Sequence, residues 1–339
     1  MACCDEPRST WLHSVASDIR TPDGQSAMTK RANGISPGSP AFPVAVVCPV
    51  CKSASLAVHD KRVTCGDCDY CGAIVSGYLD LVHGNRFDDE ASEECLCYEE
   101  DSNEYTAREY WVPLFQRLLG RRETKPRLLA VGCGTGVEVD LLHDAGFETV
   151  GIEIGNRTAA WPRRESSDWF MMANGMSMPF ADNSFDAAFC GCVFPHVGVE
   201  GDSFNLTETG LDDRLQLATE MQRVIKPGGF VIASSPNRHF PVDMFHWREV
   251  GSYKPKFNRP GERFLLSVGD YARMFEKAGL KPDRPLPSLG YWGFVRSKHS
   301  LKGRLLALPV RALFWITSKL SILRGSVIAP WIVVTGRKP

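Results

Sequence analysis

The feature that most constrains this fold is an alternation of buried strands with amphipathic helices over the last two thirds of the chain. Strands are expected at 127–132, 148–154, 169–173, 185–192, 230–235 and 331–335. Helical periodicity is found at 103–119, 135–145, 211–225 and 267–280. Strands that alternate with helices form a mostly parallel sheet covered on both faces. The pattern therefore predicts a doubly wound α/β fold.

Turn-forming residues mark the ends of two of these helices. Pro227-Gly228-Gly229 is expected to stop one helix and to turn the chain into the fifth strand. Ser267 and Asp270 have the spacing of a capping box, and Gly279 stands at the far end of that helix.

A glycine-rich turn joins the first strand to the helix that follows it. It contains Gly132, Gly134 and Gly136. Glycine adopts the backbone angles of such a turn, and the missing Cβ allows a ligand to approach the free amides of the helix N-terminus. Val137 stands where a dinucleotide fingerprint has a small residue, which disfavours pyrophosphate binding. Glu153 ends the next strand, where an acid accepts ribose hydroxyls. Together they predict an adenosine ligand.

Four segments in this region occur in a recognisable order. They are LAVGCGTG (Leu129–Gly136), MSMPFADNSFDAAF (Met176–Phe189), EMQRVIKPGG (Glu220–Gly229) and SPN (Ser235–Asn237). They resemble motif I and the LPFxDxSFDxV, ExxRVLKPGG and TPN segments of the class I S-adenosylmethionine-dependent methyltransferases, type 11 branch. The resemblance covers roughly residues 103–339. It implies a Rossmann-like, seven-stranded sheet and S-adenosylmethionine as cofactor.

The resemblance also implies a set of cofactor-binding residues. These are Gly132, Cys133, Gly134, Gly136, Glu153, Ile154, Asn174, Gly175, Met176 and Cys190. The glycines would line the methionine and ribose, Glu153 would hold the ribose, and Cys190 would face the methionine end. Asn174 stands where the family usually has an Asp facing the adenine, and Gly175 and Met176 would border that ring. Ala130 stands where an acid is frequent, which removes a contact to the cofactor amino group.

Methyl transfer from a sulfonium mainly requires alignment of the nucleophile. His196 follows the fourth strand at the expected mouth of the site, so it is the candidate general base. A packing or surface role explains this histidine equally well. His239, Asp243 and His246 lie in the long segment after the fifth strand, which could cap the substrate, although loop polarity alone also explains them.

Two cysteine pairs precede this domain. Cys48-x-x-Cys51 and Cys65-x-x-Cys68 have the spacing of a tetrahedral zinc site, and Cys71 is an alternative fourth ligand. The segment resembles zinc ribbons that precede some methyltransferase domains, including ribosomal RNA guanine methyltransferases. Zinc would supply the folding free energy that so small a module lacks. Its expected role is structural, and substrate recognition is the alternative.

These observations divide the chain into four parts. We expect a disordered leader at 1–42, with a transit peptide as the alternative, a zinc-ribbon-like module at 43–84, an acidic linker at 85–102 and the methyltransferase domain at 103–339. Cap segments are expected at about 236–265 and 295–327.

Charge and cysteine usage limit the compartment and the partners. The chain has twelve cysteines and no apolar signal-peptide core, which favours a reducing, cytoplasmic compartment. No segment is apolar and long enough to span a bilayer. Ten Lys or Arg and no acid follow Asp283, and the segment 301–324 alternates basic with apolar residues. That segment is either an internal cap or an interfacial segment for anionic lipid or a lipophilic substrate.

Three functions follow. The first is methyl transfer to an O, N or C nucleophile of a small molecule, including a lipophilic one. The second is RNA base methylation with recognition by the zinc module, which the net charge of −1 disfavours. The third is a catalytically inactive binding protein of the same fold.

Overall fold

The computed structural model describes residues 42–84, 86, 93–120, 123–201, 203–246, 256–259, 261–294 and 301–339. Apart from Phe42, the predicted leader lies outside these residues. Within the described ranges, none of the helices combines the length and apolar character needed to cross a lipid bilayer.

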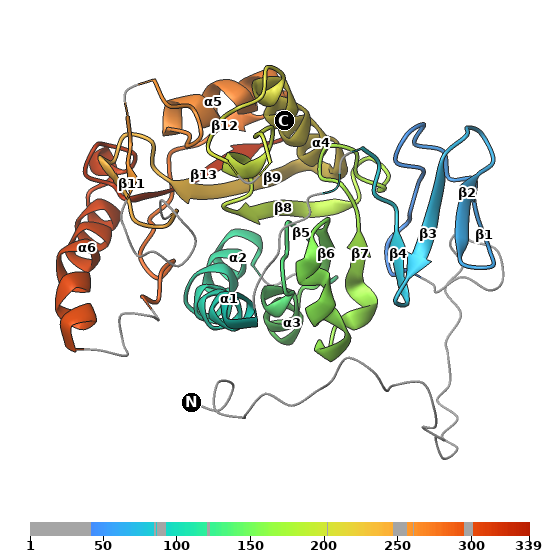
Figure 1. Cartoon of the computed structure of the whole chain (residues 1–339), viewed down its shortest axis with the longest axis horizontal. Coiled ribbons are helices and arrows are strands. Elements are labelled where there is room, and N and C mark those ends of the chain that lie inside the picture. Colours follow the sequence, from blue (N-terminus) through green and yellow to red (C-terminus); the bar gives the residue numbers. More distant parts are fainter. Residues whose placement is uncertain are drawn as a thin grey trace, which may run out of the picture.

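An eleven-stranded sheet runs through the described part of the molecule, in the order β1-β2-β3-β4-β7-β6-β5-β8-β9-β13-β12 (Figure 1). Its parallel centre consists of β5 (Arg127–Val131), β6 (Glu148–Glu153), β7 (Phe170–Met172), β8 (Phe185–Gly191) and β9 (Ile225–Pro236). Next to β9 lie the antiparallel β13 (Trp331–Arg337) and, beyond it, β12 (Lys281–Pro282). The seven strands from β7 to β12 confirm the predicted mostly parallel α/β sheet.

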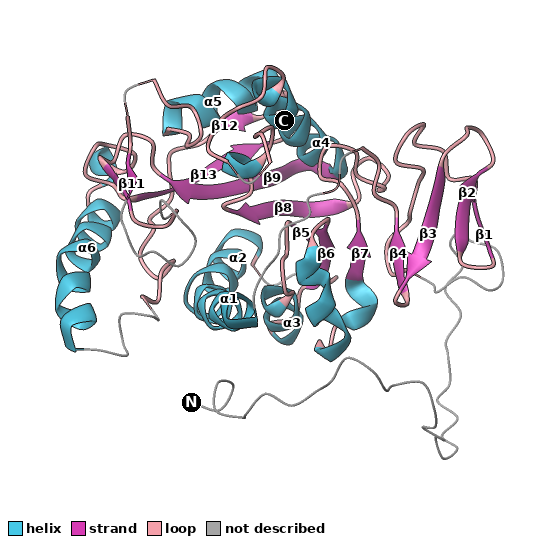
Figure 2. Ribbon diagram, viewed as in Figure 1, coloured by secondary structure: helices cyan, strands magenta, loops and turns pink. Residues whose placement is uncertain are grey.

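Helices cover both faces of this sheet (Figure 2). One face carries α1 (Glu93–Thr106), α2 (Val112–Leu119) and α3 (Val137–Asp144), and the other carries α4 (Gly210–Val224) and α5 (Val268–Lys277). Successive side chains of β5 alternate between two apolar cores. Leu128 and Ala130 lie in one core, and Leu129 and Val131 lie in the other. The capping box predicted at Ser267 is present at the start of α5.

The fifth strand begins earlier than the sequence predicts. Helix α4 ends at Val224 and β9 starts directly at Ile225, so Pro227-Gly228-Gly229 lies inside the strand. Its register with β8 shifts between Phe185 and Ala187, which marks a bulge. Gly228 has φ +78°, and a Cβ on Gly229 would lie 2.7 Å from the Asp186 carbonyl oxygen. The glycines therefore form a bulge in place of the predicted turn.

Part of the predicted acidic linker is helical. Helix α1 starts at Glu93, and its acids pair with arginines of the segment that follows β6. The Arg157 guanidinium contacts Glu99 through Nε (2.6 Å) and Nη2 (2.7 Å), and Glu100 pairs with Arg163 and Arg164. Bidentate pairs of this kind fix a helix more firmly than exposed single ones. Residues 93–102 therefore belong to the packed domain.

The cysteine-rich module continues the sheet. Its strands are β1 (Leu56–His59), β2 (Arg62–Cys65), β3 (Cys71–Val75) and β4 (Tyr78–Asp80). The first three pairings are antiparallel, and β4 then joins β7 in parallel through Asp80 and Met172. Val46, Leu56 and Leu79 of the module are buried in one core with residues of the main domain.

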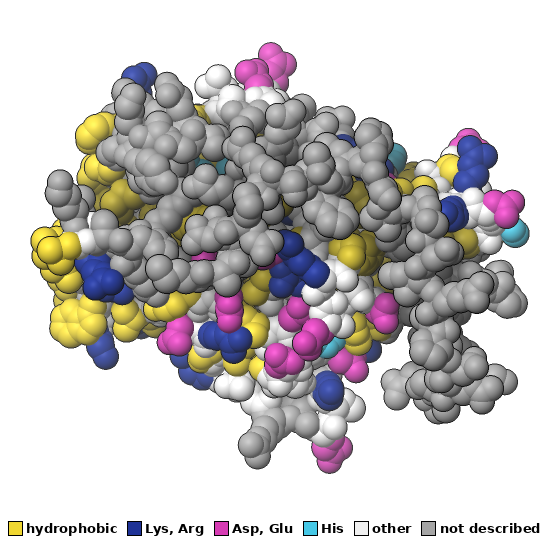
Figure 3. Space-filling view, turned by 60° about the horizontal axis from the view of Figure 1, so that its bottom comes forward, with side chains coloured by type: hydrophobic (Ala, Val, Ile, Leu, Met, Phe, Trp, Pro, Cys, Tyr) yellow, Lys and Arg dark blue, Asp and Glu magenta, His cyan; other side chains and the backbone are white. Residues whose placement is uncertain are grey.

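Helix α6 (Leu301–Lys319) lies at the end of the molecule opposite the cysteine-rich module (Figure 1). Its Phe314 is buried and packs edge-on against Phe294, with ring centroids 5.8 Å apart. Apolar side chains gather at this edge of the space-filling view (Figure 3). The exposed large ones of α6 and the segment after it are Leu301, Leu305, Leu308, Trp315, Leu320, Ile322, Val327 and Ile328. The short strands β10 (Val242–Asp243) and β11 (Lys256–Phe257) pair antiparallel in a separate two-stranded sheet.

Candidate functional site

Two adjoining cavities open at the carboxyl ends of β5, β6 and β8. The larger has a volume of about 510 Å³, which suits a nucleoside-sized ligand. The smaller has a volume of about 120 Å³. Val131 and Gly132 line both cavities, so they meet at the end of β5. This is the edge at which doubly wound sheets bind ligands.

The glycine-rich turn is shaped by its surroundings. Gly132 has φ +67°, and a Cβ there would lie 2.5 Å from Cγ2 of Val193. Gly136 has φ +81°, and a Cβ there would lie 2.5 Å from the Phe170 ring. Side chains at either position would therefore both strain the backbone and clash. The turn leaves bare backbone at the junction of the two cavities.

Glu153 lines the larger cavity at the end of β6. Its Oε1 accepts the backbone N–H groups of Ile154 (2.7 Å) and Gly155 (3.1 Å), and its Oε2 accepts that of Gly134 (3.0 Å). A carboxylate has about four acceptor positions, so one remains after these three bonds. Glu153 thus ties the glycine turn to β6 and keeps an acceptor for a ligand.

Several other predicted cofactor residues line the larger cavity, namely Ile154, Asn174, Gly175 and Met176. The amide of Asn174 is bonded to backbone at both ends. Its Nδ2 donates to the His83 carbonyl (3.0 Å), and its Oδ1 accepts the Met176 N–H (2.9 Å). Asn174 therefore shapes the loop and joins it to the end of the cysteine-rich module.

The remaining predicted cofactor residues lie elsewhere. Cys190 lines the smaller cavity, where burial raises the pKa of its thiol. Gly134 and Gly136 are not among the described residues that line either cavity. The side chain of Cys133 is buried in the core, where its Sγ would lie 2.7 Å from a Cβ on Gly151. Only the backbone of Cys133 is placed to approach a ligand.

The smaller cavity contains an acid that sequence reasoning missed. Glu138, on the first turn of α3, lines it beside Ala130. Its Oε2 is buried, and no donor among the described residues lies within hydrogen-bond distance. Burial raises the pKa of Glu138 to about 8, and the charge of Glu153 adds to this effect. Ser102 and Thr106 of α1 line the same cavity. A buried carboxyl oxygen that has no donor among the described residues indicates a cationic or donor ligand.

His196 lies where the sequence places it, in a short helical turn after β8, and it lines the larger cavity. Desolvation by the surrounding protein lowers the pKa of His196, and the charge of the nearby His246 lowers it further. His246 Nδ1 donates to Oδ2 of the buried Asp243 at 2.9 Å. The two histidine rings are in contact although fifty residues separate them, with their Nε2 atoms 3.2 Å apart. His239 lines neither cavity among the described residues.

The four predicted zinc ligands converge. The Sγ atoms of Cys48, Cys51, Cys65 and Cys68 all lie within 4.8 Å of one another. The Cys48–Cys68 and Cys51–Cys65 sulfur pairs are each 3.6 Å apart, close to the roughly 3.8 Å edge of a tetrahedron with Zn–S bonds of about 2.3 Å. Cys71 is exposed and outside this group. The donor set therefore fits zinc.

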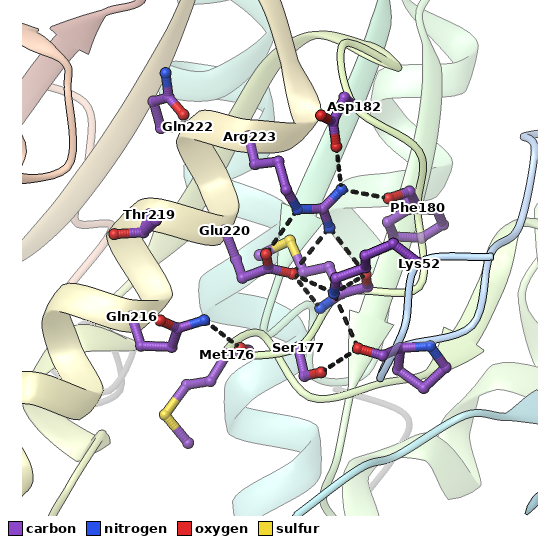
Figure 4. A network of polar contacts seen from close by, with 12 residues as sticks. Lys52, Met176, Ser177, Phe180, Asp182, Gln216, Thr219, Glu220, Gln222 and Arg223 are labelled. Atoms are coloured by element: carbon purple, nitrogen blue, oxygen red, sulfur yellow. Dashed lines mark hydrogen bonds and ion pairs between the residues drawn. The ribbon is translucent and has the colours of Figure 1, made fainter. Parts of the chain in front are cut away.

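Polar contacts join the loop around Lys52, which carries Cys48 and Cys51, to α4 and to residues 177–182 (Figure 4). Lys52 Nζ donates to Glu220 Oε2 (3.0 Å) and to the Met178 carbonyl (3.2 Å). Arg223 Nε donates to Glu220 Oε1 at 2.7 Å. Burial alone would raise the pKa of Glu220, but Arg223 and Lys52 hold it below its usual range. Ser177 Oγ donates to the Pro49 carbonyl at 2.6 Å, so the metal-binding loop supports residues 174–178.

Comparison with known proteins identifies the family. Residues 129–233 match the family described as a methyltransferase domain. A methyltransferase of Mycolicibacterium gilvum is 32% identical over 186 residues, which are 49% of this chain and 67% of that protein. The chain is a class I S-adenosylmethionine-dependent methyltransferase family member.

Other similar proteins have a lower sequence identity to this chain or match a shorter part of it. A probable S-adenosylmethionine-dependent methyltransferase of Mycolicibacterium smegmatis is 29% identical over 183 residues, 50% of this chain and 65% of that protein. A Haemonchus contortus phosphoethanolamine N-methyltransferase structure is 13% identical, with a TM-score of 0.46, over 74% of this chain and 58% of that chain. The chain spans less than two thirds of the M. smegmatis protein and 36% of a Mycobacterium leprae methyltransferase.

Proposed function

We propose that this chain transfers a methyl group from S-adenosylmethionine to an O, N or C nucleophile of a small molecule. One observation carries the proposal. Gly132, Glu153 and the 174–176 loop, which the sequence predicts to hold an adenosyl group, line a single cavity of about 510 Å³. When bound, S-adenosylmethionine supplies a methyl group already activated by its sulfonium. The protein's own task is to bind, orient and exclude water.

The residues present fit this cofactor at each of its ends. Glu153 is the acceptor for the ribose, and Asn174, Gly175 and Met176 border the adenine. Glu138 would accept the ammonium of the methionine moiety, since its buried Oε2 lacks a donor among the described residues. It would thereby supply, from α3, the acid that is missing at Ala130. Zinc at the four cysteines would be structural, because that loop supports residues 174–178.

The role of Glu138 predicts a proton release on binding. The pKa of its free carboxyl is about 8, so it is mostly protonated at pH 7. An adjacent ammonium stabilises the carboxylate, so cofactor binding lowers this pKa and expels a proton. Calorimetric titrations in buffers of different ionisation enthalpy should measure this release at pH 7. Glu138→Gln should abolish the release and weaken binding about tenfold or more, as loss of a charged hydrogen bond does.

Asp144→Asn is the matched control, because Asp144 is an exposed acid at the end of the same helix. It should leave both affinity and proton release unchanged. A Glu138→Gln variant with wild-type affinity and wild-type proton release would refute the role of Glu138.

The exposed surface of α6 favours a lipophilic acceptor or contact with anionic lipid. Four large apolar side chains of α6 are exposed, as are four more in the segment after it, and Arg304, Arg311 and Lys319 lie on α6. No residue of this segment is among the described ones that line either cavity. This surface supports an interfacial role for the segment, with an internal cap as the alternative.

Transfer of labelled methyl groups tests the proposed function. The protein is incubated with labelled S-adenosylmethionine and with separate RNA, protein, aqueous-metabolite and lipid-soluble fractions. Label should enter a small molecule, with the lipid-soluble fraction labelled most strongly. Label confined to RNA would replace this proposal by RNA base methylation. Cofactor binding without transfer into any fraction would favour a binding protein.

A further inference from the structure

A second group of metal-ligating side chains lies beside the cavities. Cys192 follows β8, His196 is in the turn after it, and His246 follows β10. Their ligand atoms all lie within 4.8 Å of one another. His246 Nε2 is 3.2 Å from His196 Nε2 and 3.5 Å from Cys192 Sγ. The segment after β8 and the segment after β10 thus present soft and borderline donors to one point.

These separations match the edges of a metal tetrahedron. Zinc takes histidine nitrogen at about 2.0–2.1 Å and cysteine sulfur at about 2.3 Å. Tetrahedral angles then place two nitrogens about 3.3 Å apart, and a nitrogen and a sulfur about 3.6 Å apart. The observed 3.2 and 3.5 Å agree with both values.

The hydrogen bonds of Asp243 orient the His246 ring toward this point. Asp243 is buried, and its Oδ1 accepts the backbone N–H groups of Phe245 and His246. Its Oδ2 faces His246 Nδ1, which therefore carries the proton. In the neutral ring, Nε2 then has one lone pair, yet two polar atoms approach it. A metal ion would satisfy all three groups, and a carboxylate behind a ligating histidine is a usual partner of zinc.

The surrounding residues hold the three groups in place. Cys192 has φ +56°, an unfavourable conformation for a side chain with a Cβ, and its N–H donates to the Ser234 carbonyl at 2.8 Å. Phe264 packs edge-on against both His196 and His246, with ring centroids 5.4 and 5.0 Å apart. Strained residues held by their surroundings are characteristic of functional sites.

We propose that Cys192, His196 and His246 bind one Zn²⁺ ion and leave its fourth position open. His196 lines the larger cavity and Cys192 the smaller, so the ion would lie beside their junction. Three protein ligands with an open position are typical of zinc sites that act on a bound ligand. The open position suits a thiol or hydroxyl acceptor, bound as its anion after releasing a proton to solvent. This last point rests on the proposed function, whereas zinc binding itself does not.

Zinc content of the purified full-length protein tests the proposal. Elemental analysis should find about two ions per chain, one for each group of ligands. Cys192→Ser and His246→Ala should each lower the content to about one, as should Cys51→Ser in the other group. Cobalt-substituted protein should show two distinct sets of visible bands, and Cys192→Ser should remove the set from the site with one thiolate.

Cys71→Ser and His239→Ala are the controls, since both residues are exposed and outside the two groups. They should retain about two ions. About one ion per wild-type chain, or an unchanged content in Cys192→Ser, would overturn the proposal even if other variants fail to fold. Cofactor binding by protein with one zinc would refute this metal site alone. Two zinc ions without cofactor binding would refute the proposed function alone.

Discussion

Replacing Glu153 by Gln is expected to weaken S-adenosylmethionine binding about ten- to a hundredfold. A hydrogen bond to a charged acceptor contributes about 1.5–3 kcal/mol, and about 1.4 kcal/mol is a tenfold change. In the wild type, the Glu153 carboxylate accepts three backbone N–H groups. The variant replaces one acceptor oxygen by an amide N–H₂, which is itself a donor, and this loosens the glycine turn. Calorimetric titration with S-adenosylmethionine measures the loss.

The matched control is Glu148→Gln, at the other end of the same strand. Glu148 pairs with Arg127 through Nη2 at 2.9 Å and lines neither cavity among the described residues. Its variant should bind the cofactor as the wild type does. If a folded Glu153→Gln protein kept its affinity within threefold, the assignment of the ribose to this carboxylate would be wrong.

Loss of zinc from the four-cysteine cluster should have the largest effect on stability. Zinc contributes an apparent free energy of about 10–16 kcal/mol to folding in small modules of this type. Cys51→Ser should therefore unfold the cysteine-rich module around its metal-binding loop. It should also lower the midpoint temperature of thermal unfolding of the whole chain. Because Lys52 and Pro49 contact residues 177–178, cofactor affinity should fall as well. Circular dichroism and cofactor titration measure the two effects.

Cys71→Ser separates metal loss from mere loss of a thiol. Cys71 is exposed and lies outside the cluster, so its variant should keep the wild-type midpoint and zinc content. A Cys51→Ser protein that melted with the wild type, and bound the cofactor equally well, would show that this zinc has no structural role.

Local patterns were sufficient for much of the fold. The glycine turn and Glu153 could be placed because their backbone angles and their position at strand ends are local properties. The capping box at Ser267 is likewise set by residues three apart. The helix at 93–102 could not be predicted as packed, because its stabilising partners follow β6 and are about sixty residues away. The bulge at Gly229 depends on its contact with Asp186 of the neighbouring strand.

The candidate site, like the fold, could be predicted from the sequence only where local patterns determine it. From the sequence alone, Ala130 implies that the site lacks an acid at this point. In the fold, Glu138 of the next helix lines the same cavity as Ala130 and supplies a carboxyl there. Nothing in the local sequence pairs Cys192 with His246, because they meet only where the segment after β9 folds back over β8. The resemblance implies that Cys133 binds the cofactor, and because its side chain is buried, only its backbone can approach a ligand. Spacing predicts backbone geometry better than the direction of side chains.

The most direct test of the central claim is calorimetric titration of the folded, zinc-loaded wild-type protein with S-adenosylmethionine. The cavity formed by the glycine turn, Glu153 and the 174–176 loop predicts one bound molecule per chain, with protons released at pH 7. Absence of binding at millimolar concentrations of both this compound and its demethylated product would contradict the account.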